Sequence, residues 1–153
     1  IIYSNGVIEH IADPKKFLNI LYKILKKRGI LFLSAANDFN IFQYMSLKTT
    51  KKPWWIVPPE HINYFRVSDI NKVFNKKKFK IKYLNTTFPI EVFLLMGDNY
   101  VKNKKLGKLS HFRRTVFEKN FEKLEMLNYR EQIYKNFSDL GLGRAIEVIV
   151  QKK

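Results

Sequence analysis

The feature that most constrains this chain is a strand–helix–strand pattern within its first 36 residues. An apolar run over residues 1–4 is broken by Asn5-Gly6, and a second, continuous apolar run spans residues 30–36. Between them Asp13-Pro14 marks a helix start, since Asp accepts hydrogen bonds from first-turn amides and Pro fits the first helical position. Two apolar strands joined through a helix form a right-handed βαβ unit with parallel strands. The pattern therefore predicts an α/β fold.

The segment after Pro14 has the spacing of an amphipathic helix. Its apolar residues recur every three or four positions, with lysines on the other face: Phe17, Leu18, Leu21, Ile24 and Leu25. We expect Gly29 to end this helix as a C-terminal cap, with cations at the negative end of the helix dipole. The run 30–36 is typical of a strand buried on both faces of a parallel sheet.

The rest of the chain predicts further elements. Residues 41–47 form a short amphipathic piece, and the Pro- and Trp-rich stretch after it favours an irregular segment over the mouth of a site. Ser68 is a suitable N-cap for a helix that carries Ile70, Val73 and Phe74. The later elements are expected to be a strand at 79–85, a helical segment at 89–100, one long helical stretch at 110–137 and a last strand at 145–150.

Composition narrows the class of protein. A length of 153 residues fits one domain, and 46% hydrophobic residues is too many for a disordered chain. The absence of Cys excludes disulfides, thiolate metal sites and Cys nucleophiles. Because the three histidines (His10, His61 and His111) are far apart in the sequence, we also predict no metal site.

The charge has two interpretations. Lys and Arg together number 29 against 13 Asp and Glu, a formal net charge of +16. Trp54-Trp55 beside Lys51-Lys52 fits single-stranded nucleic acid, which binds cations and stacking aromatics. Most of the cations are Lys, however, and scattered Lys is typical of solvated helix faces, whereas specific readers of bases favour Arg. We therefore regard nucleic acid as an unlikely partner and keep a basic nucleic-acid-binding module as the alternative function.

Nothing in the sequence indicates a membrane or an export signal. No run reaches the 18 or more apolar residues that span a bilayer, and no signal peptide is visible. We expect no membrane partner and a cytoplasmic location.

Two short segments carry the chemistry. They are residues 5–14, Asn-Gly-Val-Ile-Glu-His-Ile-Ala-Asp-Pro, and residues 58–65, Pro-Pro-Glu-His-Ile-Asn-Tyr-Phe. Together with the βαβ unit, these two segments resemble class I S-adenosylmethionine-dependent methyltransferases. More narrowly, they resemble the branch of ubiquinone-biosynthesis-type and small-molecule or sugar methyltransferases. In that branch the loop after the fourth strand reads V-[IL]-E-H-[IV]-x-D-P, and P-x-H-x-x-Y-F follows the fifth strand. A Gly-Gly pair precedes the fifth strand there, where this chain has Arg28-Gly29.

The resemblance covers about residues 1–85, and the last strand fits the family's antiparallel C-terminal edge. The family's glycine-rich loop and the acidic residue of its second strand have no counterpart, because Gly141-Leu142-Gly143 precedes a strand and opens no helix. The resemblance thus implies the C-terminal part of a Rossmann-like methyltransferase sheet, with the N-terminal cofactor-binding half missing and the fragment inactive alone. On this interpretation residues 1–153 are a single partial domain, with residues 1–88 and 143–153 forming the sheet and 89–142 a mostly helical insertion or lid.

The same resemblance implies the cofactor and the site. S-adenosylmethionine is the expected methyl donor, and a small-molecule or sugar-type compound is the expected acceptor. Ligands of open α/β sheets bind beyond the carboxyl ends of the strands. The cofactor-binding candidates are therefore Ser4, Asn5, Gly6 and Val7.

The catalytic candidates are His10 and His61, because imidazole titrates near neutral pH and suits a general base, with Glu9 to orient one of them or to accept a proton itself. The substrate-binding candidates are Trp54, Trp55, Glu60 and Tyr64.

Each candidate also has a purely structural interpretation. Glu9 and His10 suit hydrogen bonds that shape their loop, and His61 suits a packed histidine. Trp54 and Trp55 suit a cover for the sheet edge, and Tyr64 suits a core position. An RNA methyltransferase fragment stays a further alternative, although Ser4-Asn5-Gly6-Val7 stands where enzymes that methylate base amino groups carry an Asn-Pro-Pro-Tyr type of motif.

Overall fold

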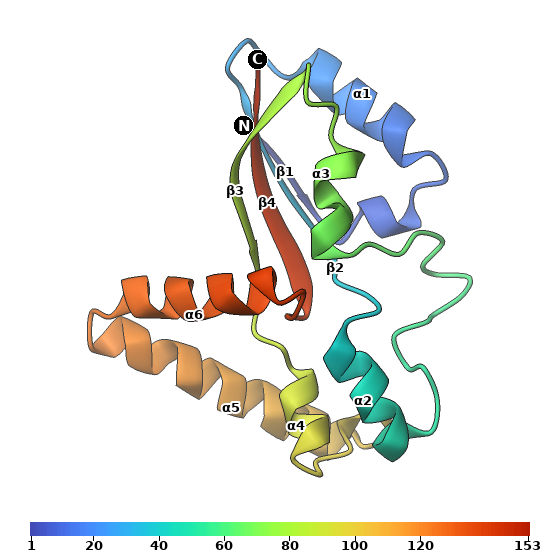
Figure 1. Cartoon of the computed structure of the whole chain (residues 1–153), viewed down its shortest axis with the longest axis vertical. Coiled ribbons are helices and arrows are strands. Elements are labelled where there is room, and N and C mark those ends of the chain that lie inside the picture. The colour runs from blue at the N-terminus through green and yellow to red at the C-terminus, as the bar shows by residue number, and fades with distance from the viewer.

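The computed structural model describes residues 1–153 and has a four-stranded mixed sheet as its centre (Figure 1). The strands are β1 (Ile2–Asn5), β2 (Ile30–Ala36), β3 (Phe79–Thr86) and β4 (Ala145–Lys152). Their spatial order is β1-β2-β4-β3, with β1 parallel to β2 and β4 antiparallel to both of its neighbours. The predicted α/β class with a parallel β1–β2 pair is confirmed. The expectation that the last strand lies at the sheet edge is wrong, because β4 lies between β2 and β3.

The burial pattern of β4 explains its central place. Ile146, Val148 and Val150 alternate along the strand, and none of them has any exposed surface. The strand β4 pairs with β2 on one side, where Val148 is opposite Leu33, and with β3 on the other side, where Val150 is opposite Ile81. A strand at the sheet edge would bury less of this apolar surface, so the apolar alternation favours the centre.

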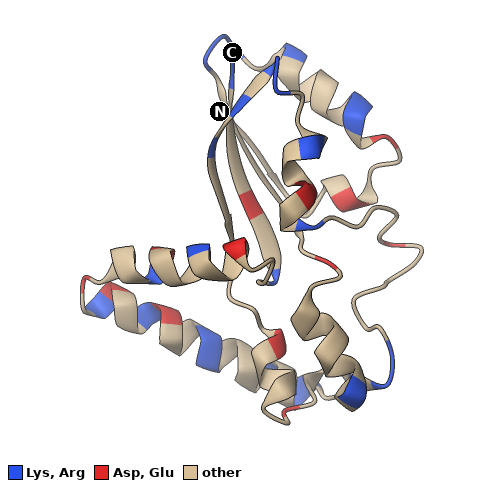
Figure 2. Ribbon diagram, viewed as in Figure 1, with Lys and Arg blue, Asp and Glu red and all other residues tan.

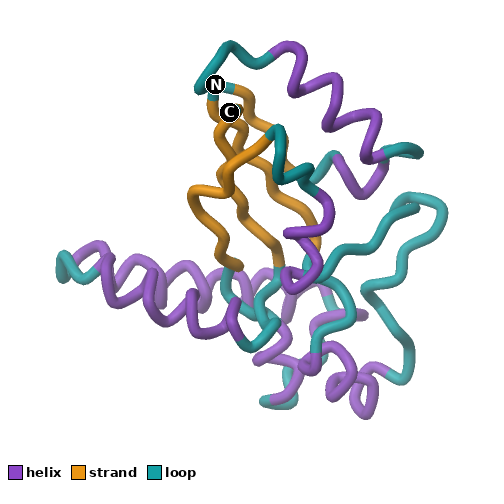
Figure 3. The backbone as a smooth tube through the Cα atoms, turned by 45° about the horizontal axis from the view of Figure 1, so that its top comes forward, coloured by secondary structure: helices purple, strands orange, loops and turns teal.

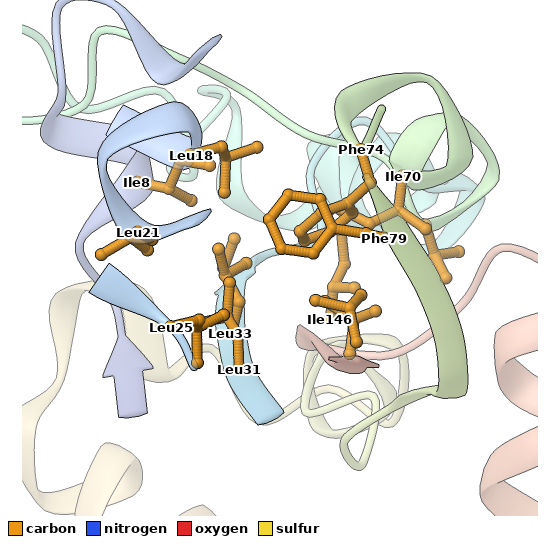
Figure 4. Close-up of a cluster of buried hydrophobic side chains, with 14 residues drawn as sticks. Ile8, Leu18, Leu21, Leu25, Leu31, Leu33, Ile70, Phe74, Phe79 and Ile146 are labelled. Atoms are coloured by element: carbon orange, nitrogen blue, oxygen red, sulfur yellow. The ribbon is translucent and has the colours of Figure 1, made fainter. Parts of the chain in front are cut away.

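One face of the sheet is covered by helix α1 (Pro14–Ile24) and the single turn α3 (Ile70–Val73). Apolar side chains from these helices meet the strands in one core, drawn in Figure 4, whose members include Leu18, Leu21, Leu33, Ile70 and Ile146. On the opposite face Tyr3 is 70% exposed and stacks on Phe32, with ring centroids 4.9 Å apart. The prediction that β2 is buried on both faces is therefore wrong at this end of the strand.

The start of α1 is as predicted, and its end is not. Asp13 caps the helix as predicted, since its side chain accepts from the Lys16 amide at 2.9 Å. The helix ends at Ile24 and the next residue is extended, so Gly29 is not its cap. Arg28, at the position of the first Gly of the family's pair, has a φ of 60°. This left-handed conformation costs a non-glycine residue roughly 1–2 kcal/mol, whereas glycine adopts it freely. The backbone at position 28 therefore explains why the family pattern has a glycine there.

The later helices also differ from the expectation. Ser68 lies inside the short 3-10 helix Val67–Asp69 and makes no capping hydrogen bond. The predicted long helix at 110–137 is two helices, α5 (Lys104–Lys123) and α6 (Leu127–Asp139), which pack side by side in Figures 1 and 3. The chain reverses through Glu125, whose φ is 55°. Helix α2 (Ile41–Thr50), helix α4 (Glu91–Leu95) and the 3-10 turn Tyr100–Lys102 complete this part of the molecule.

Charge is spread along the helices. Figure 2 shows Lys and Arg distributed over α1, α5 and α6, whereas the strands carry few of them. None of the helices is both long and apolar enough to cross a bilayer.

Candidate functional site

The parallel strands β1 and β2 end at the same edge of the sheet, where the chain turns sharply at Gly6. Gly6 has a φ of 62° and its amide donates to the carbonyl of Ser34 at 3.1 Å. Ser4 is buried, and its Oγ has no hydrogen-bond partner, whereas Asn5 and Val7 are exposed. A Cβ at Gly6 would come within 3.9 Å of Glu9 Oε1, so the bare backbone of this turn lies directly beside Glu9.

A network of hydrogen bonds joins the 3-10 helix η1 (Ile8–His10), which follows this turn, to residues 60–63. The amides of Ile62 and Asn63 both donate to the Glu9 carbonyl at 3.0 Å, and Asn63 Nδ2 donates to the Ile11 carbonyl at 2.6 Å. His10 Nδ1 lies 2.5 Å from the Glu60 carbonyl oxygen. The two segments singled out in the sequence therefore form one local structure, although about 50 residues separate them.

This structure brings Glu9, His10 and His61 together. The two imidazole rings meet edge to face with centroids 4.9 Å apart, and one ligand-capable atom from each of the three side chains lies within 4.8 Å of the other two. Glu9 is 5% exposed, and its Oε2 has no hydrogen-bond partner; the buried Nδ1 of His61 has none either. Two histidines that are far apart in the sequence thus share one site, which removes the premise of the prediction that no metal site exists.

Tyr64 links this cluster to a pocket. Its ring lies against His61 and Phe39, with centroid distances of 6.2 and 5.7 Å, and its hydroxyl accepts from the Val57 amide at 3.3 Å. Tyr64 also lines an open pocket of about 560 Å³. The other lining residues come from the start of α1, from Phe39 after β2, and from α3 with the stretch before it, and they include Asp13, Lys15, Phe65, Arg66 and Lys72. The pocket has both aromatic and charged walls, and it opens on the helix-covered side of the sheet edge.

The two tryptophans lie in different surroundings. Trp55 is 2% exposed and packs edge to face on Phe39 and Tyr44, so it belongs to an aromatic cluster that continues to Tyr64. The Trp54 ring instead lies under the Arg144 guanidinium at 4.9 Å. Neither ring contacts the imidazoles, and the Glu60 side chain is exposed, its residue reaching the cluster through its carbonyl oxygen.

Sequence reasoning missed a buried set of charges at the same sheet edge. Asp38 is the second residue after β2 and is 1% exposed, and burial raises the pKa of its carboxyl to about 6 against the opposing effect of Arg144. Glu91 is fully buried, with Arg144 Nη1 3.9 Å away, and burial raises its pKa as well. The sequence signal for Asp38 was available, because it is a charged residue placed two positions after a continuous apolar strand. Glu91 and Arg144 carry no such signal, since their pairing depends on where α4 packs.

The cluster, the Gly6 turn and the pocket surround the carboxyl ends of two parallel strands, where α/β enzymes bind their ligands. No curated protein matches this sequence. A family model described as a methyltransferase domain matches residues 1–84, which include β1, α1, β2, both motif segments and most of β3. Since the match spans more than half of the 153 residues and includes the whole Glu9–His10–His61 cluster, the chain belongs to the methyltransferase domain family.

Proposed function

We propose that this chain takes part in methyl transfer from S-adenosylmethionine to a small-molecule or sugar-type acceptor, as the acceptor-side portion of the enzyme. The observation that carries the proposal is the position of the Glu9–His10–His61 cluster, directly beyond the turn at Gly6 within the family match. The glycine-rich loop that grips the cofactor elsewhere in the family has no counterpart here, which supports the narrower role.

The residues at the end of β1 fit the methionine end of the cofactor. Ser4 Oγ is a buried hydroxyl without a partner, and Gly6 leaves the backbone bare where the chain turns. We assign Ser4, Asn5, Gly6 and Val7 to contact with the cofactor. When bound there, S-adenosylmethionine supplies an electrophilic methyl group on its sulfonium.

The histidines serve the acceptor. An acceptor hydroxyl that forms a bond to the methyl carbon must lose its proton, and the leaving group is the neutral thioether. His10 and His61 offer nitrogen atoms beside the Gly6 turn, and Glu9 holds its carboxylate next to both. Holding the acceptor oxygen in line with the methyl group and removing its proton are the two tasks that this arrangement serves.

The pocket supports a small acceptor. Its volume of about 560 Å³ lies within the range that small-molecule sites have, roughly 300–1,000 Å³. Tyr64 connects the pocket to His61, and we assign Tyr64, Glu60 and the aromatic cluster of Trp54 and Trp55 to shaping the acceptor site. Because Trp55 is buried and Arg144 lies over one face of the half-buried Trp54 ring, the two tryptophans do not form an open stacking platform, which favours a small acceptor over a nucleic acid.

The test is isothermal titration of the full-length protein with S-adenosylmethionine. We expect saturable binding, and a Gly6→Val variant should bind at least tenfold more weakly, because its side chain would fill the turn beside Glu9. Gly97→Val is the matched control, since Gly97 also has a positive φ, and nothing lies within 4 Å of its added Cβ. Absence of binding by the unmodified protein, or equal weakening by both variants, would contradict the proposal.

A further inference from the structure

The Glu9–His10–His61 cluster brings three side chains together, and each has a ligand-capable atom without a hydrogen-bond partner. A carbonyl oxygen only accepts hydrogen bonds, so His10 Nδ1 must carry the proton that it donates to Glu60, and this fixes Nε2 as the free, unprotonated nitrogen of the neutral ring. His61 Nδ1 is buried without a partner. Glu9 Oε2 is likewise unpartnered in a residue that is 95% buried.

Such atoms are costly unless something binds them. A buried carboxylate oxygen without a donor loses its hydration and regains nothing from the protein. No Lys or Arg forms an ion pair with Glu9, although the chain carries 29 of them. The cluster therefore holds one carboxylate and two imidazole rings, and no cationic side chain partners them.

We propose that Glu9, His10 and His61 bind a divalent transition-metal ion of the zinc type, with a coordination position left open toward the acceptor. Two imidazoles and one carboxylate are a ligand set that such ions take when a further position must stay free for water or substrate. The hydrogen bond from His10 Nδ1 to the Glu60 carbonyl is the outer contact that metal-bound histidines usually make, and it holds the ring with Nε2 available.

The geometry requires only a small closure. One ligand-capable atom of each side chain lies within 4.8 Å of the other two, whereas ligands at metal bonds of about 2.0–2.2 Å are roughly 3.4 Å apart in a tetrahedral site. His10 is exposed and His61 half-buried, so a small shift of these side chains toward a shared ion does not disturb the core. The backbone is already fixed by the bonds from Ile62 and Asn63 to the Glu9 carbonyl.

The role of the ion rests on the proposed function, but its binding does not. An acceptor hydroxyl at the open position would have its pKa lowered by the metal, so its proton is lost to solvent without a free imidazole, and the oxygen stays aimed at the methyl carbon. With the ion bound, His10 and His61 act as its ligands, and the metal takes over the activation of the acceptor hydroxyl that the proposed function gives to them as bases. The acceptors that suit this site are hydroxyl compounds, such as a sugar, which can approach the metal through one oxygen.

The experiment is metal binding by the chelator-treated chain without any polyhistidine tag and without S-adenosylmethionine. Calorimetric titration with zinc chloride is expected to show about one ion per chain, and Co²⁺ should give visible absorption bands from nitrogen and oxygen ligation. His10→Ala and His61→Ala should each weaken Zn²⁺ binding at least tenfold. His111→Ala removes the remaining histidine, which lies on α5, and should leave binding unchanged.

Circular dichroism of each variant establishes that it is folded. His10 and His61 lie in different segments, so if one of the two variants fails to fold, the other still tests the metal site. Zinc binding that is absent from the unmodified chain, or equal in the His10, His61 and His111 variants, would overturn the metal site. Zinc binding in a protein that fails to bind S-adenosylmethionine would overturn the proposed function and leave the metal site standing.

Discussion

At the scale of single residues, burial decides which charged groups behave unusually. Asp38 is the second residue after β2 and is 1% exposed, and its Oδ2 has no hydrogen-bond partner. Burial raises the pKa of its carboxyl to about 6; Glu9 and Glu91 raise it further, and Arg144 and Gln43 lower it. The folded chain therefore binds this proton more tightly than the unfolded chain does.

This shift has a definite consequence for stability. Between pH 4 and pH 6 the folded state holds more protons than the unfolded state at this carboxyl, so its contribution to stability falls as the pH rises. Asp38→Asn removes the titration, and relative to the unmodified chain it should gain up to about 3 kcal/mol at pH 7.5 compared with pH 4. Urea unfolding of both proteins at the two pH values measures the change. An equal difference between them at both pH values would contradict the assignment.

At the scale of elements, the turn between α6 and β4 fixes how the helical hairpin, formed by α5 and α6, joins the sheet. Asn37, at the end of β2, donates through Nδ2 to the carbonyls of Gly141 and Gly143 at 3.0 Å, and its Oδ1 accepts from the Val67 amide at 3.0 Å. One buried amide side chain therefore connects β2, the turn before β4 and the start of the segment that leads into α3.

Gly143 is the position in this turn that tolerates no side chain. Its φ is 105°, and an added Cβ would lie 2.7 Å from the Thr87 carbonyl oxygen and closer still to the Thr86 side chain. Gly143→Ala should cost about 3 kcal/mol or more, from the left-handed conformation together with the clash. Gly141→Ala is the matched control, since its φ is 76° and its surroundings are open, and it should cost about 1 kcal/mol. Chemical denaturation of both variants gives the comparison, and equal losses would show that the Thr86 contact is unimportant.

At the scale of the whole molecule, the sheet with α1 and α3 holds most of the apolar core, and the helical hairpin holds little. The core cluster of 14 buried residues draws on β2, β3, β4, α1 and α3 and includes no residue of α5 or α6. Helix α5 has 20 residues, of which only Ser110 is buried. The hairpin contacts the rest through smaller contacts, such as Phe117 against Phe88 and the Tyr83 hydroxyl donating to Glu131.

This division predicts the order of local opening. Amides in the centre of β2 and β4, such as those of Leu33 and Val148, should exchange with deuterium most slowly, because their release requires opening the main core. Amides in α5 should exchange at least tenfold faster, since little apolar surface is lost when this helix opens. Hydrogen exchange followed by NMR or mass spectrometry tests the order, and equal protection of α5 and β4 would show that the molecule opens as one unit.

Local sequence patterns predicted much of this fold. The apolar run 30–36 corresponds to β2 residue for residue, Asp13-Pro14 starts α1, and residues 145–150 lie within β4. The failures have local physical reasons. The helical spacing at 110–137 continues through Glu125, but Glu125 adopts a φ of 55° and the chain reverses there. The packing of α5 against α6 stabilises this reversal, and a local sequence pattern does not show that contact.

The sequence by itself determined the βαβ unit and the two motif segments, because strand, cap and helix signals act over a few neighbouring residues. It named Glu9, His10 and His61 but predicted no metal site, since spacing along the chain carries no information about distance in space. Tertiary structure decided that β4 lies inside the sheet and that Trp55 is buried. It also decided that the amides of Ile62 and Asn63 donate to the Glu9 carbonyl, which places His61 beside His10. Each of these depends on contacts between residues about 10 to more than 100 positions apart, and such contacts form only when the whole apolar core is buried together.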